Sequence, residues 1–138
     1  MKISVVYWSG TGNTEKMAVA VSDGAKKGGA ETELMTVSEA TADVLNSDVI
    51  LFGCPAMGAE ELEESEFEPF FSGIEGKLGG KKVGLFGSYG WGDGEWMRNW
   101  EETCKADCAV LACDSVICND APDDDALTEC KNLGKALA

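Results

Sequence analysis

Two glycines and three hydroxyl side chains lie between residues 9 and 14, directly after an apolar run. The segment reads Ser9-Gly10-Thr11-Gly12-Asn13-Thr14, and an amphipathic helical pattern begins at its end. Glycine lets backbone N–H groups face an anion without a side chain in the way, and the hydroxyls add neutral donors at a helix N-terminus. The segment therefore predicts a site for a mononucleotide-like phosphate. A tight loop with an ordinary helix cap is the alternative interpretation.

The spacing excludes two well-known phosphate loops. A Walker loop requires Gly-x4-Gly-Lys-Ser/Thr, and a dinucleotide fingerprint would require a glycine at Glu15. The segment fits neither pattern, so the expected phosphate is bound by neutral donors.

Large apolar residues stand in two further glycine-rich segments. Met57 lies in residues 55–61, and Trp91 lies in residues 87–94. Both side chains are suited to pressing on a flat aromatic ring, and we predict that they form a stacking pair. The alternative is that each folds inward over the edge of a sheet. Trp8, beside the first loop, is a third candidate contact or an ordinary core residue.

The segments that must position these loops alternate between strand and helix patterns. Strands are expected at 2–7, 30–37, 48–54, 81–86 and 108–118, and helices at 14–28, 38–46, 65–76, 95–106 and 123–137. The run from Val49 to Phe52 is apolar throughout, which suits a central parallel strand covered on both faces. The alternation predicts an α/β fold with a doubly wound five-stranded parallel sheet and helices on both faces. Ligands of such sheets bind at the carboxyl ends of the strands, and we expect all three loops to converge there because each follows a strand.

The length predicts a single domain, and the net charge limits the classes of partner. The chain has 138 residues and a net charge of −14, from 25 acidic and 11 basic residues. Such a charge disfavours nucleic acid and anionic membranes and favours a basic protein partner, although an acidic surface that only aids solubility is the alternative. No targeting signal or membrane span is recognisable, so a cytoplasmic location is expected.

The cysteines do not predict a metal site. Six are present, without a Cys-x-x-Cys pair and without any histidine. Reduced, mostly packed thiols are expected in the cytoplasm. Cys104 and Cys108, one turn apart at a helix end, are candidates for an exposed reactive thiol.

Three motifs in this order resemble the flavodoxins: Ser9 to Thr14, Gly53-Cys54-Pro55-Ala56-Met57-Gly58 and Gly87-Ser88-Tyr89-Gly90-Trp91-Gly92. The likeness covers essentially the whole chain. It is greatest to the short-chain flavodoxins of anaerobic bacteria, because the fifth strand lacks the insertion of the long-chain type. The resemblance implies a flavodoxin-like fold with strand order 2-1-3-4-5 and one noncovalent FMN. It also implies low-potential one-electron transfer between semiquinone and hydroquinone, in place of a ferredoxin.

The resemblance also assigns roles to residues. It implies that the first loop holds the FMN phosphate, while Met57 and Trp91 cover the two flavin faces. The Gly58 peptide would turn its carbonyl toward flavin N5, and Glu60 would accept a hydrogen bond from N3–H. The expected FMN-binding residues are Ser9, Gly10, Thr11, Gly12, Asn13, Thr14, Pro55, Ala56, Met57, Gly58, Glu60, Ser88, Tyr89, Gly90, Trp91, Gly92, Asp93 and Asn119.

The acidic composition suggests how the potential is lowered. Fully reduced FMN is an anion at N1, and Glu60, Asp93 and the phosphate oppose that charge. Each 1.36 kcal/mol of destabilisation lowers a one-electron potential by about 59 mV. Basic faces of redox proteins would dock on an acidic rim of Glu61, Glu63, Glu64 and Asp93, and a monomer is expected.

An electron carrier that performs no substrate chemistry is the leading prediction. The alternative is an FMN-dependent NAD(P)H reductase on the same fold. The lack of histidine for acid–base work and the expected cover of Trp91 over the flavin disfavour it. A thiol-based redox sensor or metal protein is a third possibility that rests on the cysteines alone.

Overall fold

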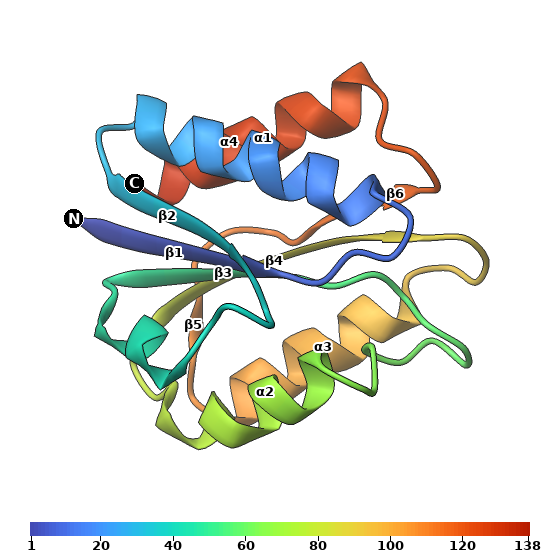
Figure 1. The fold of residues 1–138 in the computed structure, drawn as a ribbon, viewed down its shortest axis with the longest axis horizontal. Helices are drawn as coiled ribbons and strands as arrows, with labels where there is room; N and C mark the ends of the chain where they lie inside the picture. The colour runs from blue at the N-terminus through green and yellow to red at the C-terminus, as the bar shows by residue number, and fades with distance from the viewer.

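Strands and helices alternate along the chain and form a sheet with a helical layer on each face (Figure 1). The structure, a computed structural model, describes residues 1–138. The elements are β1 (Lys2–Tyr7), α1 (Asn13–Lys27), β2 (Glu31–Thr36), the 3-10 helix η1 (Ala42–Asn46), β3 (Val49–Gly53), α2 (Phe67–Ile74), the 3-10 helix η2 (Glu75–Lys77), β4 (Lys82–Tyr89), α3 (Glu95–Ala106), β5 (Val110–Leu111), β6 (Val116–Asn119) and α4 (Asp124–Leu137). None of the helices has both the length and the apolar character that crossing a bilayer requires.

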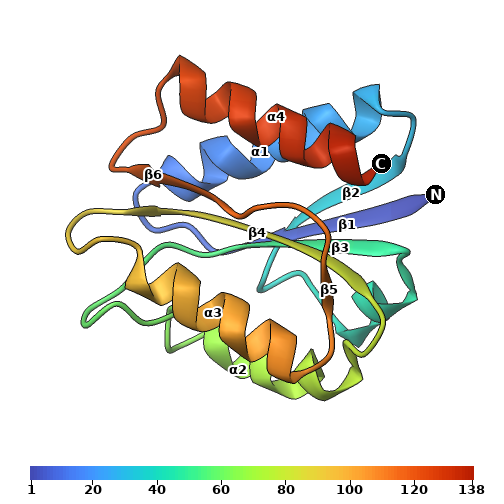
Figure 2. The same ribbon diagram turned by 180° about the vertical axis from the view of Figure 1, so that it is seen from behind.

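The sheet is parallel and has the order β2-β1-β3-β4-β5, with β6 also paired to β4. Helices α1 and α4 cover one face, and α2 and α3 cover the other (Figures 1 and 2). The predicted fold class and the strand order 2-1-3-4-5 are confirmed. The order reverses between β1 and β3, which is where such sheets bind ligands.

The core is divided by the sheet into two apolar layers. Val5 and Leu51 belong to the layer under α1 and α4, while Val6 and Phe52 belong to the layer under α2 and α3. Successive strand residues point to opposite faces, so a strand covered on both sides is apolar at every position. All five residues of β3 are buried, as its sequence predicts.

The predicted continuous strand over 108–118 is wrong. Leu111 pairs with Val83, and Val116 pairs with Phe86. The interval of five residues from Leu111 to Val116 therefore lies opposite an interval of only three residues in β4. The surplus residues leave the sheet as a bulge. Ser115, inside this bulge, donates to Glu101 on α3 at 3.0 Å, which gives the displaced polar segment a partner.

Other elements differ from the expected ones in extent. The short helix after β2 is only the 3-10 turn η1, and the helix expected over 65–76 is shortened to α2 followed by η2. Strand β4 continues to Tyr89, so Gly87, Ser88 and Tyr89 are strand residues rather than loop residues. They are drawn into the sheet because β6 pairs with β4 up to this point.

Candidate functional site

A cavity of about 210 Å³ opens at the carboxyl ends of β1, β3 and β4. Its lining residues are Trp8, Ser9, Gly10, Thr11, Asn13, Thr14, Pro55, Ala56, Met57, Ser88, Tyr89, Gly90 and Asp120. The loops that carry these residues come from separate parts of the chain and meet at one end of the molecule, opposite both termini (Figure 1). The predicted convergence of the three loops is therefore confirmed.

The first loop presents uncommitted hydrogen-bond donors at the start of α1. Ser9 Oγ accepts from the Gly12 N–H at 3.1 Å, so its own proton is free to be donated. The Thr14 hydroxyl oxygen is buried and has no hydrogen-bond partner. The helix has no side-chain cap, and the first N–H groups of a helix lack internal partners.

This arrangement fits a phosphate. The buried Thr14 hydroxyl and the N–H groups at the start of α1 supply neutral donors, and the helix dipole favours an anion at the same place. No lysine or arginine lines the cavity. The phosphate predicted from the sequence would therefore be bound without a formal counter-charge.

Apolar side chains form the part of the cavity that suits a flat ring. Met57 follows β3, Tyr89 ends β4, and Trp8 extends from the end of β1. The Trp8 indole lies over Gly10, where an added Cβ would stand 2.9 Å from the ring. Trp8 is thus a lining residue of the cavity, in line with the third contact considered above.

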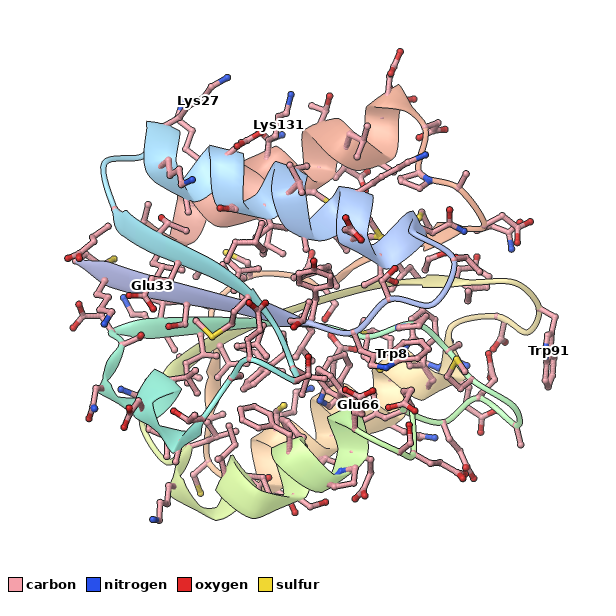
Figure 3. The ribbon with its side chains drawn as sticks, in the orientation of Figure 1. Trp8, Lys27, Glu33, Glu66, Trp91 and Lys131 are labelled. Carbon is pink, nitrogen blue, oxygen red and sulfur yellow. The ribbon has the colours of Figure 1, made fainter.

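Trp91 stands away from this cavity. It lies in the loop after β4, with 65% of its surface exposed, and projects from the molecule far from Trp8 (Figure 3). Met57 is 37% exposed. Both residues are outside the core, so the alternative in which they fold inward is wrong.

Residues 57–61 form a tight hairpin beside the cavity. The N–H of Met57 donates to the Glu61 carbonyl at 2.8 Å, and the Glu61 N–H donates back at 2.9 Å. Gly58 has φ 49° and Glu60 has φ 58°, in the left-handed region that suits glycine and strains other residues.

The Glu60 carboxylate is placed against the backbone of Gly92, where an added Cβ would lie 2.1 Å from Oε1. This Oε1 atom is buried and has no partner. Glu60 therefore bridges the hairpin and the Trp91 loop instead of lining the cavity.

The other predicted site residues surround the cavity without lining it. Gly12 is the N-cap of α1, and Asp93 forms an exposed ion pair with Arg98 at 2.9 Å. Asn119 Nδ2 donates to the Tyr89 carbonyl at 3.3 Å. These contacts brace the loops around the opening.

Asp120 is a lining residue that the sequence interpretation missed. It has φ 55°, and its carbonyl accepts from the Ser88 hydroxyl at 2.6 Å. Its position directly after a strand, at the same edge as the three loops, is the signal that could have identified it.

A second hollow, the acidic cleft, lies between α2 and α3 and has a volume of about 670 Å³. The carboxylates along it are those of Glu60, Glu61, Glu64, Glu68 and Glu75. None of them forms an ion pair with a lysine or arginine. A hydrogen bond with Glu61 raises the pKa of Glu64, and burial together with nearby Asp107 raises the pKa of Glu75.

The cysteines divide by burial. Cys54, Cys104 and Cys130 are buried, whereas Cys108 is exposed. Burial raises the pKa of Cys104 to about 12, so its thiol does not ionise near neutral pH. The expectation of an exposed thiol at Cys104 is wrong, because the last turn of α3 turns this residue into the core.

Comparison with known proteins identifies the family. The family model described as Flavodoxin matches residues 5–134. The flavodoxin of Megasphaera elsdenii is 50% identical over 137 residues, which are 99% of this chain and 98% of that protein. The flavodoxin of Clostridium beijerinckii is 48% identical over 138 residues and covers 99% of both chains.

A solved structure of this type has the same fold. The solution structure of two-electron reduced Megasphaera elsdenii flavodoxin superposes with a TM-score of 0.89 at 51% identity, over 98% of this chain and 97% of that one. Fold and sequence agree over nearly the whole length. The chain therefore belongs to the flavodoxin family of FMN-binding electron-transfer proteins.

Proposed function

We propose that the cavity between the three loops is the FMN site and that residues 1–138 form a single domain around it. The observation that carries this proposal is the buried, unpartnered hydroxyl of Thr14 at the start of α1. A buried hydroxyl without a partner costs free energy, and a phosphate oxygen accepts the proton that it offers. The one parallel sheet that spans the chain supports the single domain.

Different residues of the cavity would bind different parts of FMN. Ser9, Thr11 and Thr14 donate to the phosphate, while Met57 and Tyr89 confine the ring at the ends of β3 and β4. Trp91 is exposed in a loop where no core holds it, so it is available to cover the remaining flavin face. Gly58, Glu60, Gly92, Asp93 and Asn119 complete the proposed set by supporting the two outer loops.

The protein is an electron carrier and not an enzyme, and an NAD(P)H reductase on this fold is not favoured. When bound, FMN would supply one-electron redox chemistry. The chain itself orients the ring and shields it from water. No histidine is present for further acid–base work.

Unpaired negative charge supports operation at low potential. The buried Oε1 of Glu60 has no partner, whereas the Asp93 charge is balanced by Arg98. An uncompensated carboxylate near the ring disfavours a further negative charge, and about 1.36 kcal/mol of such destabilisation corresponds to about 59 mV. Glu60 is therefore the residue that we expect to lower the potential more than Asp93.

The carrier acts between protein partners, and we propose that those partners present basic faces to the acidic cleft. The five carboxylates of the cleft have no cationic partner and begin at Glu60, beside the proposed flavin site. Complementary charge steers such encounters. Glu63, one of the residues expected in the acidic rim, is buried and points its carboxylate at a helix N-terminus, so we exclude it from this surface.

The net charge of −14 also supports a monomer that avoids nucleic acid and anionic membranes. The exposed apolar residues Val19, Leu34 and Val110 lie on three different elements, α1, β2 and β5, and isolated apolar residues do not form a dimer surface. Unpaired cysteines are typical of reducing compartments, which supports a cytoplasmic location.

An anaerobic reductive titration of the purified protein, followed by its visible spectrum, tests the proposal. We expect one FMN per chain and two separate one-electron stages, the second at low potential. Reduction in a single two-electron stage would favour the reductase instead. Failure of the protein to take up FMN would leave the Ser9 to Thr14 loop as an ordinary helix cap.

A further inference from the structure

The hairpin of residues 57–61 rests on two fixed attachments. On one side, the Ala56 N–H donates to the Ser88 carbonyl of β4 at 3.0 Å. On the other side, the Glu63 N–H donates to Cys54 Sγ at 3.4 Å. Between these attachments Met57 and Glu61 pair with each other, so Gly58 to Glu60 are the only residues of the hairpin outside this bonding.

Glu63 is anchored by its side chain as well. Its carboxylate accepts the N–H groups of Ser65, Glu66 and Phe67 at 2.9, 2.7 and 3.0 Å, together with the Ser65 hydroxyl. Its carbonyl accepts the Glu68 N–H at 2.8 Å.

The bonds to Glu63 complete the N-terminus of α2. The next residue, Pro69, has no N–H, and Phe70 makes the first internal bond of the helix to Glu66. Glu63 alone therefore satisfies the N–H groups that the helix leaves free. A carboxylate at this place is also stabilised by the helix dipole.

Cys54, which accepts the Glu63 N–H, is itself held in place by burial and hydrogen bonds. It is fully buried at the end of β3, its N–H donates to Phe86, and its carbonyl accepts from Trp96 Nε1 at 3.1 Å. Burial raises the pKa of Cys54 to about 12, so the thiol stays neutral and available as an acceptor. The anchor thus ties the hairpin to β4 and α3 through one residue.

We propose that Glu63 is a positioning residue for electron transfer, because it anchors the hairpin and confines its motion to the tip at Gly58–Glu60. The inference rests on the proposed FMN site, since the tip acts on the potential only where flavin lies beside it. Glu63 acts through the hairpin and has no contact with the cavity. Weakening this attachment would change how strongly the tip stabilises one redox state of the flavin relative to another.

Glu63→Gln tests this role, and Glu66→Gln is the matched control. Both variants remove one charge at the same helix end, but the Glu66 side chain makes no capping bond. The Glu63→Gln substitution places an amide nitrogen, itself a donor, against the backbone N–H groups of the helix. Amide hydrogen exchange in FMN-free protein should therefore become about tenfold faster at Met57 and Glu61 in the Glu63 variant, and stay unchanged in the control.

Redox potentials separate positioning from a purely structural cap. In the FMN-loaded protein, the gap between the two one-electron potentials should change in Glu63→Gln and not in Glu66→Gln. A Glu63 variant that only melts earlier, with exchange at the hairpin and both potentials unchanged, would overturn the inference. If the wild-type protein took up no FMN, the proposed function would fail, and the exchange data would still decide whether Glu63 anchors the hairpin.

A second pair of variants applies if Glu63→Gln does not fold. Cys54→Ala removes the acceptor of the Glu63 N–H, and Cys54→Ser retains an acceptor of smaller size. We expect faster exchange at Glu63 and shifted potentials in the alanine variant, with partial rescue in the serine variant. Wild-type behaviour of Cys54→Ala on both measurements would contradict the anchor.

Discussion

Single residues in the cavity and in the loops around it combine strain, exposure and missing partners in a way that packing alone does not explain. Trp91 is exposed among glycines, the hydroxyl of Thr14 is buried without a partner, and Glu60 and Asp120 adopt left-handed backbone conformations. Such features cost free energy in the protein alone. Their concentration at one edge of the sheet is expected of a binding site.

Replacing Trp91 by alanine should weaken FMN binding by about tenfold, since an aromatic stacking contact contributes about 0.5–1.5 kcal/mol beyond area burial. The free energy of unfolding of the FMN-free protein should change by less than about 0.5 kcal/mol, because the side chain is 65% exposed. Fluorescence titration with FMN measures the first effect and urea unfolding the second. Trp91→Phe serves as the control that retains a ring, and equal affinity in wild type and Trp91→Ala would exclude stacking.

Gly58→Val should narrow the gap between the two one-electron potentials. The φ of 49° at Gly58 costs a β-branched residue about 1–3 kcal/mol. A change in the conformation of this peptide at the tip therefore becomes energetically less favourable. Spectroelectrochemistry measures both potentials. Ala59→Val is the control in the same hairpin, at a residue without positive φ. If both variants shifted the potentials equally, the backbone freedom of Gly58 would not be the cause.

At the scale of elements, some helix ends and helix crossings require particular residues. The N-terminus of α2 depends on one carboxylate, and the crossing of α1 and α4 depends on two glycines. Neither requirement can be predicted from the apolar patterns that predict the helices.

The stability of α2 should depend on pH through Glu63. Burial alone would raise the pKa of Glu63, but hydrogen bonds from Ser65, Phe67 and Glu66 lower it to about 2 in the folded protein, from an ordinary 4.5. A lowered carboxyl pKa stabilises the fold above the unfolded pKa, and this contribution is lost as the pH falls from 4.5 toward 2.

Urea unfolding from pH 7 to pH 2 checks this expectation. Glu63→Gln should be less stable than wild type by up to about 3 kcal/mol at pH 7, and the difference should shrink as the pH approaches 2. Glu66→Gln should show no such pH dependence. A constant difference between Glu63→Gln and wild type at all pH values would contradict the role of the charge.

Gly134→Ala should destabilise the protein, because a Cβ at this position would lie 2.0 Å from the Val21 carbonyl of α1. Forcing the two helices apart should cost about 1–3 kcal/mol in the free energy of unfolding. Gly73→Ala in α2 is the control, since nothing lies within 4 Å of that Cβ, and it should stabilise the protein slightly. FMN affinity should change in neither variant. Equal stability of Gly134→Ala and wild type would show that the crossing adapts freely.

At the scale of the whole molecule, the distribution of charge decides how partners approach. The net charge is −14, and the row of unpaired carboxylates in the acidic cleft begins at Glu60, beside the proposed flavin site. Long-range attraction is screened by salt, with a Debye length of about 10 Å at 0.1 M.

Electron transfer to a basic c-type cytochrome should therefore slow as ionic strength rises. Stopped-flow rates between low and high salt measure the effect. Neutralising Glu64 and Glu68 together should reduce both the rate at low salt and its salt dependence, whereas neutralising Glu31 and Glu33 on β2 should do so less. Rates independent of salt would exclude docking through the cleft.

Much of the fold and part of the site could be predicted from the sequence. The alternating strand and helix patterns, the glycine and hydroxyl loop and the position of each loop after a strand are local features, because a few neighbouring residues determine them. They were sufficient for the parallel sheet and the convergence of the loops, whereas the order of the strands came from the family resemblance. The family resemblance added FMN, which no local pattern specifies by itself.

The tertiary structure alone decided the rest, because the rest depends on contacts between distant segments. The fifth strand splits where β4 offers pairing at two separate places, and Asp120 reaches the cavity only through β6. Glu63 and Glu64 are adjacent and chemically identical in the sequence. The start of α2 and the buried thiol of Cys54 turn the first inward as an anchor and leave the second on the surface, since only the folded chain brings backbone donors to one of the two carboxylates.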